Sequence, residues 1–156
     1  MFRSQIGQDK YISDVIFKNK KSGFFIELGA ADGERISNTF YFEKELGWKG
    51  VCIEPNPEYK DSLIKNRTCE LCFDPVYSTS GKCVDFDVVN NGELSGMTEH
   101  IDSNIYNMGY TKQTIQLTTR TLTEILDSIN APTYIDYLSL DTEGTELEIL
   151  KGLEII

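Results

Sequence analysis

Short apolar runs alternate with amphipathic segments along most of the chain. Four runs are bounded by glycine, proline or polar residues, and we predict strands at residues 24–28, 50–54, 69–73 and 137–141. Around them, apolar residues recur at helical spacing in residues 8–17, 37–46, 57–65, 121–129 and the segment after Asp141. Strands that alternate with helices are typical of an α/β domain.

Two of these helices carry an expectation about their apolar side. In the first helix, the apolar residues at helical spacing are Tyr11, Ile12, Val15 and Ile16. In the helix at residues 57–65, the side chains expected to point inward are Tyr59, Leu63 and Ile64.

The middle of the chain has a different pattern. Residues 82–89 and 114–118 alternate apolar and polar side chains, as half-exposed strands do. Between them, residues 90–112 are polar, contain three glycines and show little periodicity. We expect a loop there, of a length that is usually functional or mobile.

Composition narrows the classes of function. The 156 residues suit one domain, residues 1–156, and 15 Lys and Arg against 25 Asp and Glu give a net charge of −10. That charge opposes binding to nucleic acid or to an anionic membrane. No apolar run approaches the roughly 20 residues that span a bilayer, and MFRSQIGQDK lacks the apolar core of a signal peptide. We therefore expect a cytoplasmic protein.

The four cysteines include a CxxC pair, Cys69 and Cys72, whose spacing occurs in metal and redox sites. This pair lies in a predicted strand, where the two thiols would point to opposite faces. A structural zinc site also needs four good ligands, and His100 is the only histidine. Reduced, buried thiols are therefore the favoured interpretation, and no metal site is predicted from the cysteines.

The first predicted strand runs into a glycine loop, in the stretch FFIELGAADGE. Such a loop often holds phosphates, because backbone N–H groups at the following helix attract anions. Here the loop reads Gly29-Ala30-Ala31-Asp32-Gly33, which lacks the middle glycine of GxGxxG and places an acid near the phosphates. No GxxxxGK[ST] motif is present either.

Acidic residues at the strand ends suit a cationic ligand without phosphate, and S-adenosylmethionine has a sulfonium and a nucleoside. Glu27, Asp32 and Glu54 should gather at the carboxyl ends of adjacent strands, where Glu54 could accept the ribose hydroxyls. The rest of the predicted cofactor-binding set is Gly29, Ala30, Gly33, Asn38, Pro55, Asp74 and Asp141. Alternative roles stay open: Gly33 as a turn residue, Asn38 as a helix cap, and Asp74 as a turn residue before Pro75.

Several segments resemble the FkbM family of S-adenosylmethionine-dependent methyltransferases. They are SQIGQDKYI, FFIELGAADGERISNT, LGWKGVCIEPNP and IDYLSLDTEGTELEILKG. The resemblance implies a Rossmann-like class I methyltransferase, with a central mostly parallel sheet and helices on both faces. It also implies methyl transfer to a hydroxyl, often on a sugar, glycan or small metabolite. The class I fold has further strands, so the chain looks truncated after the fourth core strand, and a homodimer contact could cover that edge.

Asp141 is the first candidate for the base that removes the proton of the acceptor hydroxyl. It ends a strand that the resemblance places beside the first strand. Glu143 is a second candidate, and Asp141 with Glu143 could instead hold a divalent cation. For Glu146 and Glu148 we favour stabilisation of the helix dipole.

The segment GELSGMTEHID, residues 92–102, is the predicted acceptor loop. It contains His100, a third candidate for the base, because an imidazole side chain can take up a proton near neutral pH.

Two further functions remain open. One is a module that binds S-adenosylmethionine without turnover. The other is an NAD-dependent oxidoreductase or epimerase, which the missing middle glycine and the absence of a downstream Tyr-xxx-Lys pair disfavour.

Overall fold

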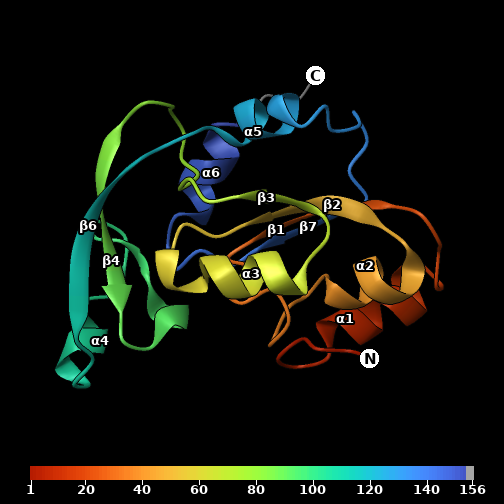
Figure 1. The fold of residues 1–156 in the computed structure, drawn as a ribbon, viewed down its shortest axis with the longest axis horizontal. Coiled ribbons are helices and arrows are strands. Elements are labelled where there is room, and N and C mark those ends of the chain that lie inside the picture. Colours follow the sequence, from red (N-terminus) through yellow and green to blue (C-terminus); the bar gives the residue numbers. More distant parts are fainter. Residues whose placement is uncertain (154–156) are drawn as a thin grey trace.

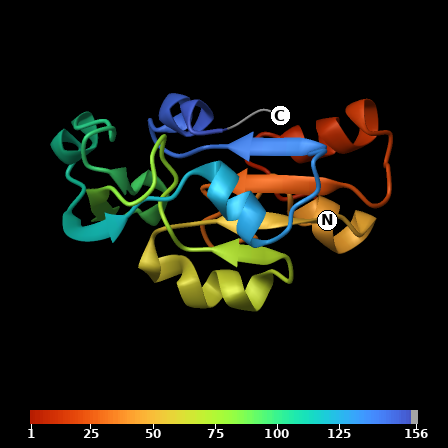
Figure 2. The ribbon, with the colours of Figure 1, turned by 90° about the horizontal axis from the view of Figure 1, so that it is seen from above.

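The computed structural model describes residues 1–153, and a four-stranded parallel sheet forms its centre (Figure 1). The sheet has the order β3-β2-β1-β7, with β1 (Phe24–Leu28), β2 (Lys49–Ile53), β3 (Glu70–Cys72) and β7 (Tyr137–Leu140). In Figure 2, β1 lies between β2 and β7. The predicted strands are confirmed, and their parallel order brings the carboxyl ends of β1, β2 and β7 together.

Helices cover both faces of the sheet, as the predicted fold class requires. One face carries α1 (Gln8–Tyr11), α2 (Phe40–Leu46) and α3 (Lys60–Asn66), and the other carries α5 (Leu122–Ser128) and α6 (Glu146–Lys151) (Figure 1). Side chains of β1 alternate between two cores. Ile26 packs with Ile125 and Ile149 in one core, and Phe25 packs with Phe42 and Leu63 in the other.

The first helix forms, but of its four predicted apolar residues only Ile12 packs against the core. It continues from α1 into a wider π-helical turn at Ile12–Ile16, and Tyr11, Val15 and Ile16 are more than half exposed. The fully buried residues are instead Asp9 and Ser13. The Asp9 carboxylate accepts the backbone N–H of Ser4 and the Ser4 hydroxyl, which offsets the cost of its burial.

The helix predicted at residues 57–65 begins as a 3-10 turn, Pro57–Tyr59, and continues as α3. Leu63 is fully buried as expected, whereas Ile64 is 52% exposed. The inward orientation predicted for Ile64 is therefore wrong.

The middle of the chain forms a second, antiparallel sheet. It has the order β5-β4-β6, with β4 (Cys83–Val89), β5 (Gly96–Met97) and β6 (Lys112–Thr118). The expected loop at residues 90–112 is more ordered than its composition indicates. It contains a 3-10 turn, Gly92–Leu94, as well as β5 and α4 (Asn104–Asn107), because Ile101 and Ile105 pack against Val89 in a small core.

The CxxC thiols lie on opposite faces of the central sheet, as predicted. Cys72 belongs to the core beneath α5 and α6, whereas Cys69 packs against the core beneath α2 and α3. All four cysteines are free.

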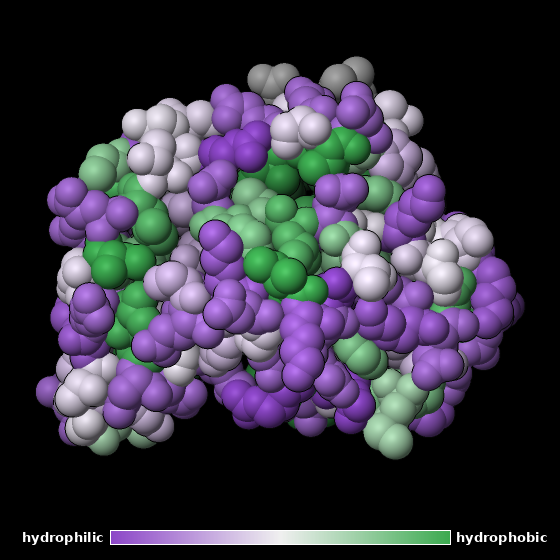
Figure 3. All heavy atoms as spheres, viewed as in Figure 1, coloured by the Kyte–Doolittle hydropathy of each residue, from purple (hydrophilic) through white to green (hydrophobic). Residues whose placement is uncertain are grey.

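On the outer surface, Figure 3 shows hydrophobic residues beside the edge strand β3, between α5 and α3, on a face that is otherwise mostly polar. Within residues 1–153, no helix is long and apolar enough to span a bilayer.

Candidate functional site

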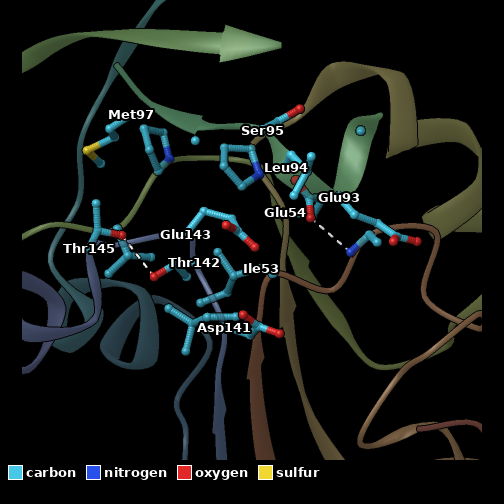
Figure 4. A pocket seen from close by; sticks show the side chains of 18 of the residues that line it. Ile53, Glu54, Glu93, Leu94, Ser95, Met97, Asp141, Thr142, Glu143 and Thr145 are labelled. Carbon is cyan, nitrogen blue, oxygen red and sulfur yellow. Dashed lines mark hydrogen bonds between the residues drawn. The ribbon is translucent and has the colours of Figure 1, made fainter. Parts of the chain in front are cut away.

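A cavity of about 200 Å³ opens where the carboxyl ends of β1, β2 and β7 meet the connection from β4 to β5 (Figure 4). Four carboxylates line it, from Glu54, Glu93, Asp141 and Glu143. Its apolar walls include Leu28, Ile36, Ile53, Pro55, Pro75, Val76, Phe86, Leu94, Met97 and Ile149. Both sheets therefore contribute to one site.

The loop after β1 is shaped by its contacts with the two neighbouring strands. The N–H groups of Gly29 and Ala30 donate to the carbonyl oxygen of Ile53, at 3.0 and 3.2 Å. Gly29 has a φ of +76° and lies against β7, where a Cβ atom would be 1.9 Å from the carbonyl oxygen of Asp141. Only glycine fits at this position. Gly29 therefore allows the ends of β1 and β7 to approach each other closely.

Glu54 is the best-defined predicted cofactor residue in the cavity. One carboxylate oxygen accepts the N–H of Ala31 at 2.8 Å, and the other accepts the N–H of Asn56 at 2.8 Å. The residue is only 7% exposed, and burial raises the pKa of its carboxyl to about 7, although these two N–H groups oppose the shift. Each oxygen keeps a lone pair for a hydroxyl donor such as a ribose.

Glu143 and Asp141 line the opposite wall. Figure 4 shows the carboxylate of Glu143 directed into the cavity. Burial raises the pKa of Glu143, and the charges of Asp141 and Glu146 add to the shift. Glu143 has a φ of +56°, an uncommon conformation for this residue type that is often found at functional sites.

Glu146 holds this wall in shape. Its carboxylate accepts the N–H groups of Thr142 at 2.8 Å and Gly144 at 3.3 Å, in the loop before α6. These hydrogen bonds lower the pKa of Glu146 although burial alone would raise it. Stabilisation of the helix dipole was predicted for Glu146, and its position in the first turn of α6 is consistent with that role, to which the hydrogen bonds to the loop add a second one.

The third wall comes from residues 92–97, in the first half of the predicted acceptor loop. Glu93 pairs with Arg35 across the cavity rim, and Ser95 accepts a hydrogen bond from Asn56. At Gly96 a Cβ atom would meet the Cβ of Glu143 at 3.4 Å, so this wall lies directly against the one that carries Glu143.

Glu27, predicted to bind the cofactor, does not line the cavity. Its buried carboxylate accepts hydrogen bonds from Ser37, Asn38 and Thr39, and Arg67 pairs with it at 3.0 Å. These partners lie toward α2 and α3, on the opposite side of the sheet from α5 and α6. The structure thus gives Glu27 a complete set of protein partners.

Three other loop residues also contact the protein and lie outside the cavity lining. Asp32 accepts the N–H groups of Glu34 and Arg35, as a turn residue does. At Gly33 a Cβ atom would be 2.6 Å from Leu63, so close packing requires glycine there. Asn38 donates to Ser139 at 2.9 Å. The capping role suggested for Asn38 is wrong, because the hydroxyl of Ser37 accepts the N–H of Phe40 at the start of α2.

His100 and Asp74 lie outside the lining as well. The His100 ring is hydrogen-bonded to the hydroxyl of Tyr77 at 3.1 Å, and Asp74 pairs with Arg120 at 3.6 Å on the surface. Of the three candidate bases, the structure brings Asp141 and Glu143 into the cavity and leaves His100 behind the wall.

Among residues 1–153, no group of three or more His, Cys, Asp or Glu side chains is arranged to hold a metal ion. The pair Asp141 and Glu143 therefore has no third ligand of these types in the described part of the chain. The cation suggested for this pair gains no support from the geometry.

Two buried polar residues were not singled out in the sequence. Arg67 is fully buried and bridges Glu27 and Glu43, and Asn56 joins Glu54 to residues 92–95. Asn56 lies between two prolines in PNP, which indicates only a break after a strand. No local pattern marks Arg67, because its partners are far away in the sequence.

Comparison with known proteins gives one match. A family model described as "Methyltransferase FkbM domain" matches residues 27–156, which include every residue of the cavity lining except Gln5. No curated protein and no solved structure matched the chain.

Proposed function

This chain belongs to the FkbM methyltransferase family, and from that premise we propose that it transfers a methyl group from S-adenosylmethionine to a hydroxyl oxygen. The acceptor in this proposal is a small metabolite or a sugar of a glycan. S-adenosylmethionine supplies an electrophilic methyl group when it is bound.

The charge of the cavity carries the proposal. Four carboxylates line it, and its described lining residues include no Lys, Arg or His. A sulfonium is attracted to such a cavity, whereas the pyrophosphate of NAD would be repelled and would find no cationic side chain. This imbalance favours the methyltransferase over the oxidoreductase.

Three of the four carboxylates have a role in the proposal. Glu54 holds the ribose through the lone pairs that its two backbone hydrogen bonds leave free. Glu143, whose pKa burial raises, removes the proton of the acceptor hydroxyl. Asp141 contributes negative charge beside Glu143 and keeps that pKa high.

Calorimetry with S-adenosylmethionine, S-adenosylhomocysteine and NAD tests the cofactor. We expect both adenosyl ligands to bind and NAD not to bind. Tight NAD binding without S-adenosylmethionine binding would exclude the proposal.

A labelled-methyl assay against hydroxylated glycans and their precursors tests the reaction, with Asp141→Ala and Glu143→Gln beside the wild type. Turnover that neither change affects would remove these carboxylates from the mechanism.

A further inference from the structure

Asn56 occupies a fully buried position between the cofactor end of the sheet and the wall formed by residues 92–95. Its backbone N–H donates to Glu54 at 2.8 Å. Its side-chain amide nitrogen donates to the Ser95 hydroxyl at 3.1 Å and to the carbonyl oxygen of Gly92 at 3.5 Å. One residue therefore touches both Glu54 and the third wall of the cavity.

Ser95 extends this connection into the second sheet. The oxygen that accepts from Asn56 also accepts the N–H of Val89, the last residue of β4, at 3.0 Å. The chain of contacts runs from the end of β2 through Asn56 and Ser95 to the end of β4. It joins two sheets that are otherwise independent hydrogen-bonded units.

Capping alone does not explain an asparagine here. The side-chain oxygen of Asn56 accepts the N–H of Glu58 and caps the turn that precedes α3, which Ser or Asp could also do. The bonds to Ser95 and Gly92 need a donor on the same side chain, and an ionised Asp has none. Asn56 therefore uses both its amide oxygen, as an acceptor, and its amide nitrogen, as a donor.

The wall has few other polar ties to the cofactor end. Glu93 pairs with Arg35, whose side chain is 63% exposed, and exposed ion pairs contribute little. The hydroxyl of Tyr59 packs close to Gly92, 2.5 Å from where a Cβ atom would be, and is a steric contact. The buried amide of Asn56 is thus the principal polar anchor of this wall.

We propose that Asn56 is a positioning residue that holds the wall of residues 92–95 in register with Glu54. The spacing between the ribose carboxylate and the wall facing the acceptor is then set by one amide. The link to cofactor and acceptor rests on the proposed function, but the anchoring does not.

Hydrogen exchange of the full chain without ligand tests the anchoring. Asn56→Ser keeps an oxygen that can cap the turn but is too short to donate a hydrogen bond to Ser95. Ser95→Ala removes the hydroxyl that accepts this hydrogen bond. Asn56→Ser removes the hydrogen bonds to Ser95 and Gly92, and Ser95→Ala removes those from Asn56 and Val89. Because a single hydrogen bond contributes about 1 kcal/mol, we expect amides 92–97 to exchange about fivefold faster or more in both variants, with β1 and β2 unchanged. Ser95→Thr keeps the hydroxyl and should exchange as the wild type does.

Ser128→Ala is the matched control, since its hydroxyl donates to Ile125 within α5, outside the cavity lining. Unchanged exchange at residues 92–97 in Asn56→Ser, or equal acceleration throughout the central sheet, would overturn the proposal.

Adding S-adenosylhomocysteine separates this inference from the cofactor proposal. We expect the ligand to slow exchange at residues 92–97 in the wild type and in Ser95→Thr, but not in Asn56→Ser. A wild type that does not bind the ligand, with faster exchange still seen in the ligand-free variants, would refute the cofactor proposal and support the anchoring. If the ligand slowed exchange at residues 92–97 equally in Asn56→Ser and the wild type, a role for Asn56 in coupling Glu54 to this wall would be refuted.

Discussion

Gly29 lies against Asp141 so closely that a Cβ atom at position 29 would be 1.9 Å from the Asp141 carbonyl oxygen. The contact joins the end of β1 to the end of β7, where the N–H of Asp141 also donates to Leu28 at 3.3 Å. It therefore fixes where Asp141, and Glu143 after it, enter the cavity.

Gly29→Ala should destabilise the fold more than a positive φ alone would. Gly47 provides a matched control, because its φ is +69° and a Cβ atom there would meet nothing within 4 Å. We expect Gly47→Ala to cost about 1 kcal/mol and Gly29→Ala about 3 kcal/mol, since only the second also overpacks. Urea unfolding measures both, and equal losses would show that the β1–β7 contact relaxes freely.

Binding of S-adenosylhomocysteine should strengthen as the pH rises through the pKa of Glu54, which burial raises to about 7. The ionised carboxylate is the better acceptor for ribose hydroxyls, so affinity at pH 6 should be up to about tenfold weaker than at pH 8. Calorimetry across this range measures the effect. In Glu54→Gln the pH dependence should vanish, and if it persists another group controls it.

The same shift affects stability with the opposite sign. The pKa of Glu54 rises from 4.5 to about 7 on folding, so the folded state holds its proton more tightly. Its contribution to the free energy of unfolding is complete below the lower pKa and is lost as the pH rises through the higher one. The difference in unfolding free energy between wild type and Glu54→Gln should therefore change between these pH values. A constant difference would contradict the shift.

Arg67→Met should be among the most destabilising single changes in the chain. Arg67 is fully buried, and its removal leaves the carboxylate of Glu27 without a cation and that of Glu43 with only Lys44, at 3.0 Å. We expect a loss of about 3–5 kcal/mol in urea unfolding. Arg35→Met, which breaks an exposed pair, should cost less than about 1 kcal/mol. Similar losses would show that the buried network relaxes.

The loss of unfolding free energy at acid pH should depend on the same Arg67–Glu43 pair. Burial alone would raise the pKa of Glu43, but Arg67 and Thr68 lower it from 4.5 to about 2. Stability from this carboxylate is present above the unfolded pKa and is lost as the pH falls toward the folded one. Glu43→Gln should therefore remove part of the acid loss, on the order of 2 kcal/mol between pH 5 and pH 2. Parallel acid unfolding curves would contradict the assignment.

Glu143→Gln should slow methyl transfer more than His100→Gln does. Glu143 points into the cavity, whereas the ring of His100 is bonded to Tyr77 outside the lining. Loss of a general base lowers turnover by about a hundredfold or more, so we expect that loss for Glu143 and less than about tenfold for His100. The turnover numbers of the two variants are compared in the labelled-methyl assay. A larger loss in His100→Gln than in Glu143→Gln would identify His100 as the base.

The strands and the glycine loop could be predicted because their signals are local. Four apolar residues among the five at 24–28, followed by a loop with two glycines, specify β1 and its turn, and strand order then places Glu54 and Asp141 at one edge. Glu27 shows where this reasoning ends. Its place on β1 was predicted, but the partners that take its carboxylate, Ser37 and Arg67, come from two other segments.

The first helix and the middle region show the same limit. Apolar spacing predicted a helix at residues 8–17, yet the buried side holds Asp9, because the N-terminal segment supplies its hydrogen bonds. Residues 90–112 have a polar composition, yet Ile101 and Ile105 order them against Val89.

By itself, the sequence determined the α/β order, the parallel sheet and the family, since these follow from periodicity and from motifs within short windows. Only the tertiary structure decided which carboxylates face the cavity and which are neutralised inside the protein. A carboxylate's role depends on the donors and cations packed around it, and here those come from residues such as Asn56 and Arg67 on other elements.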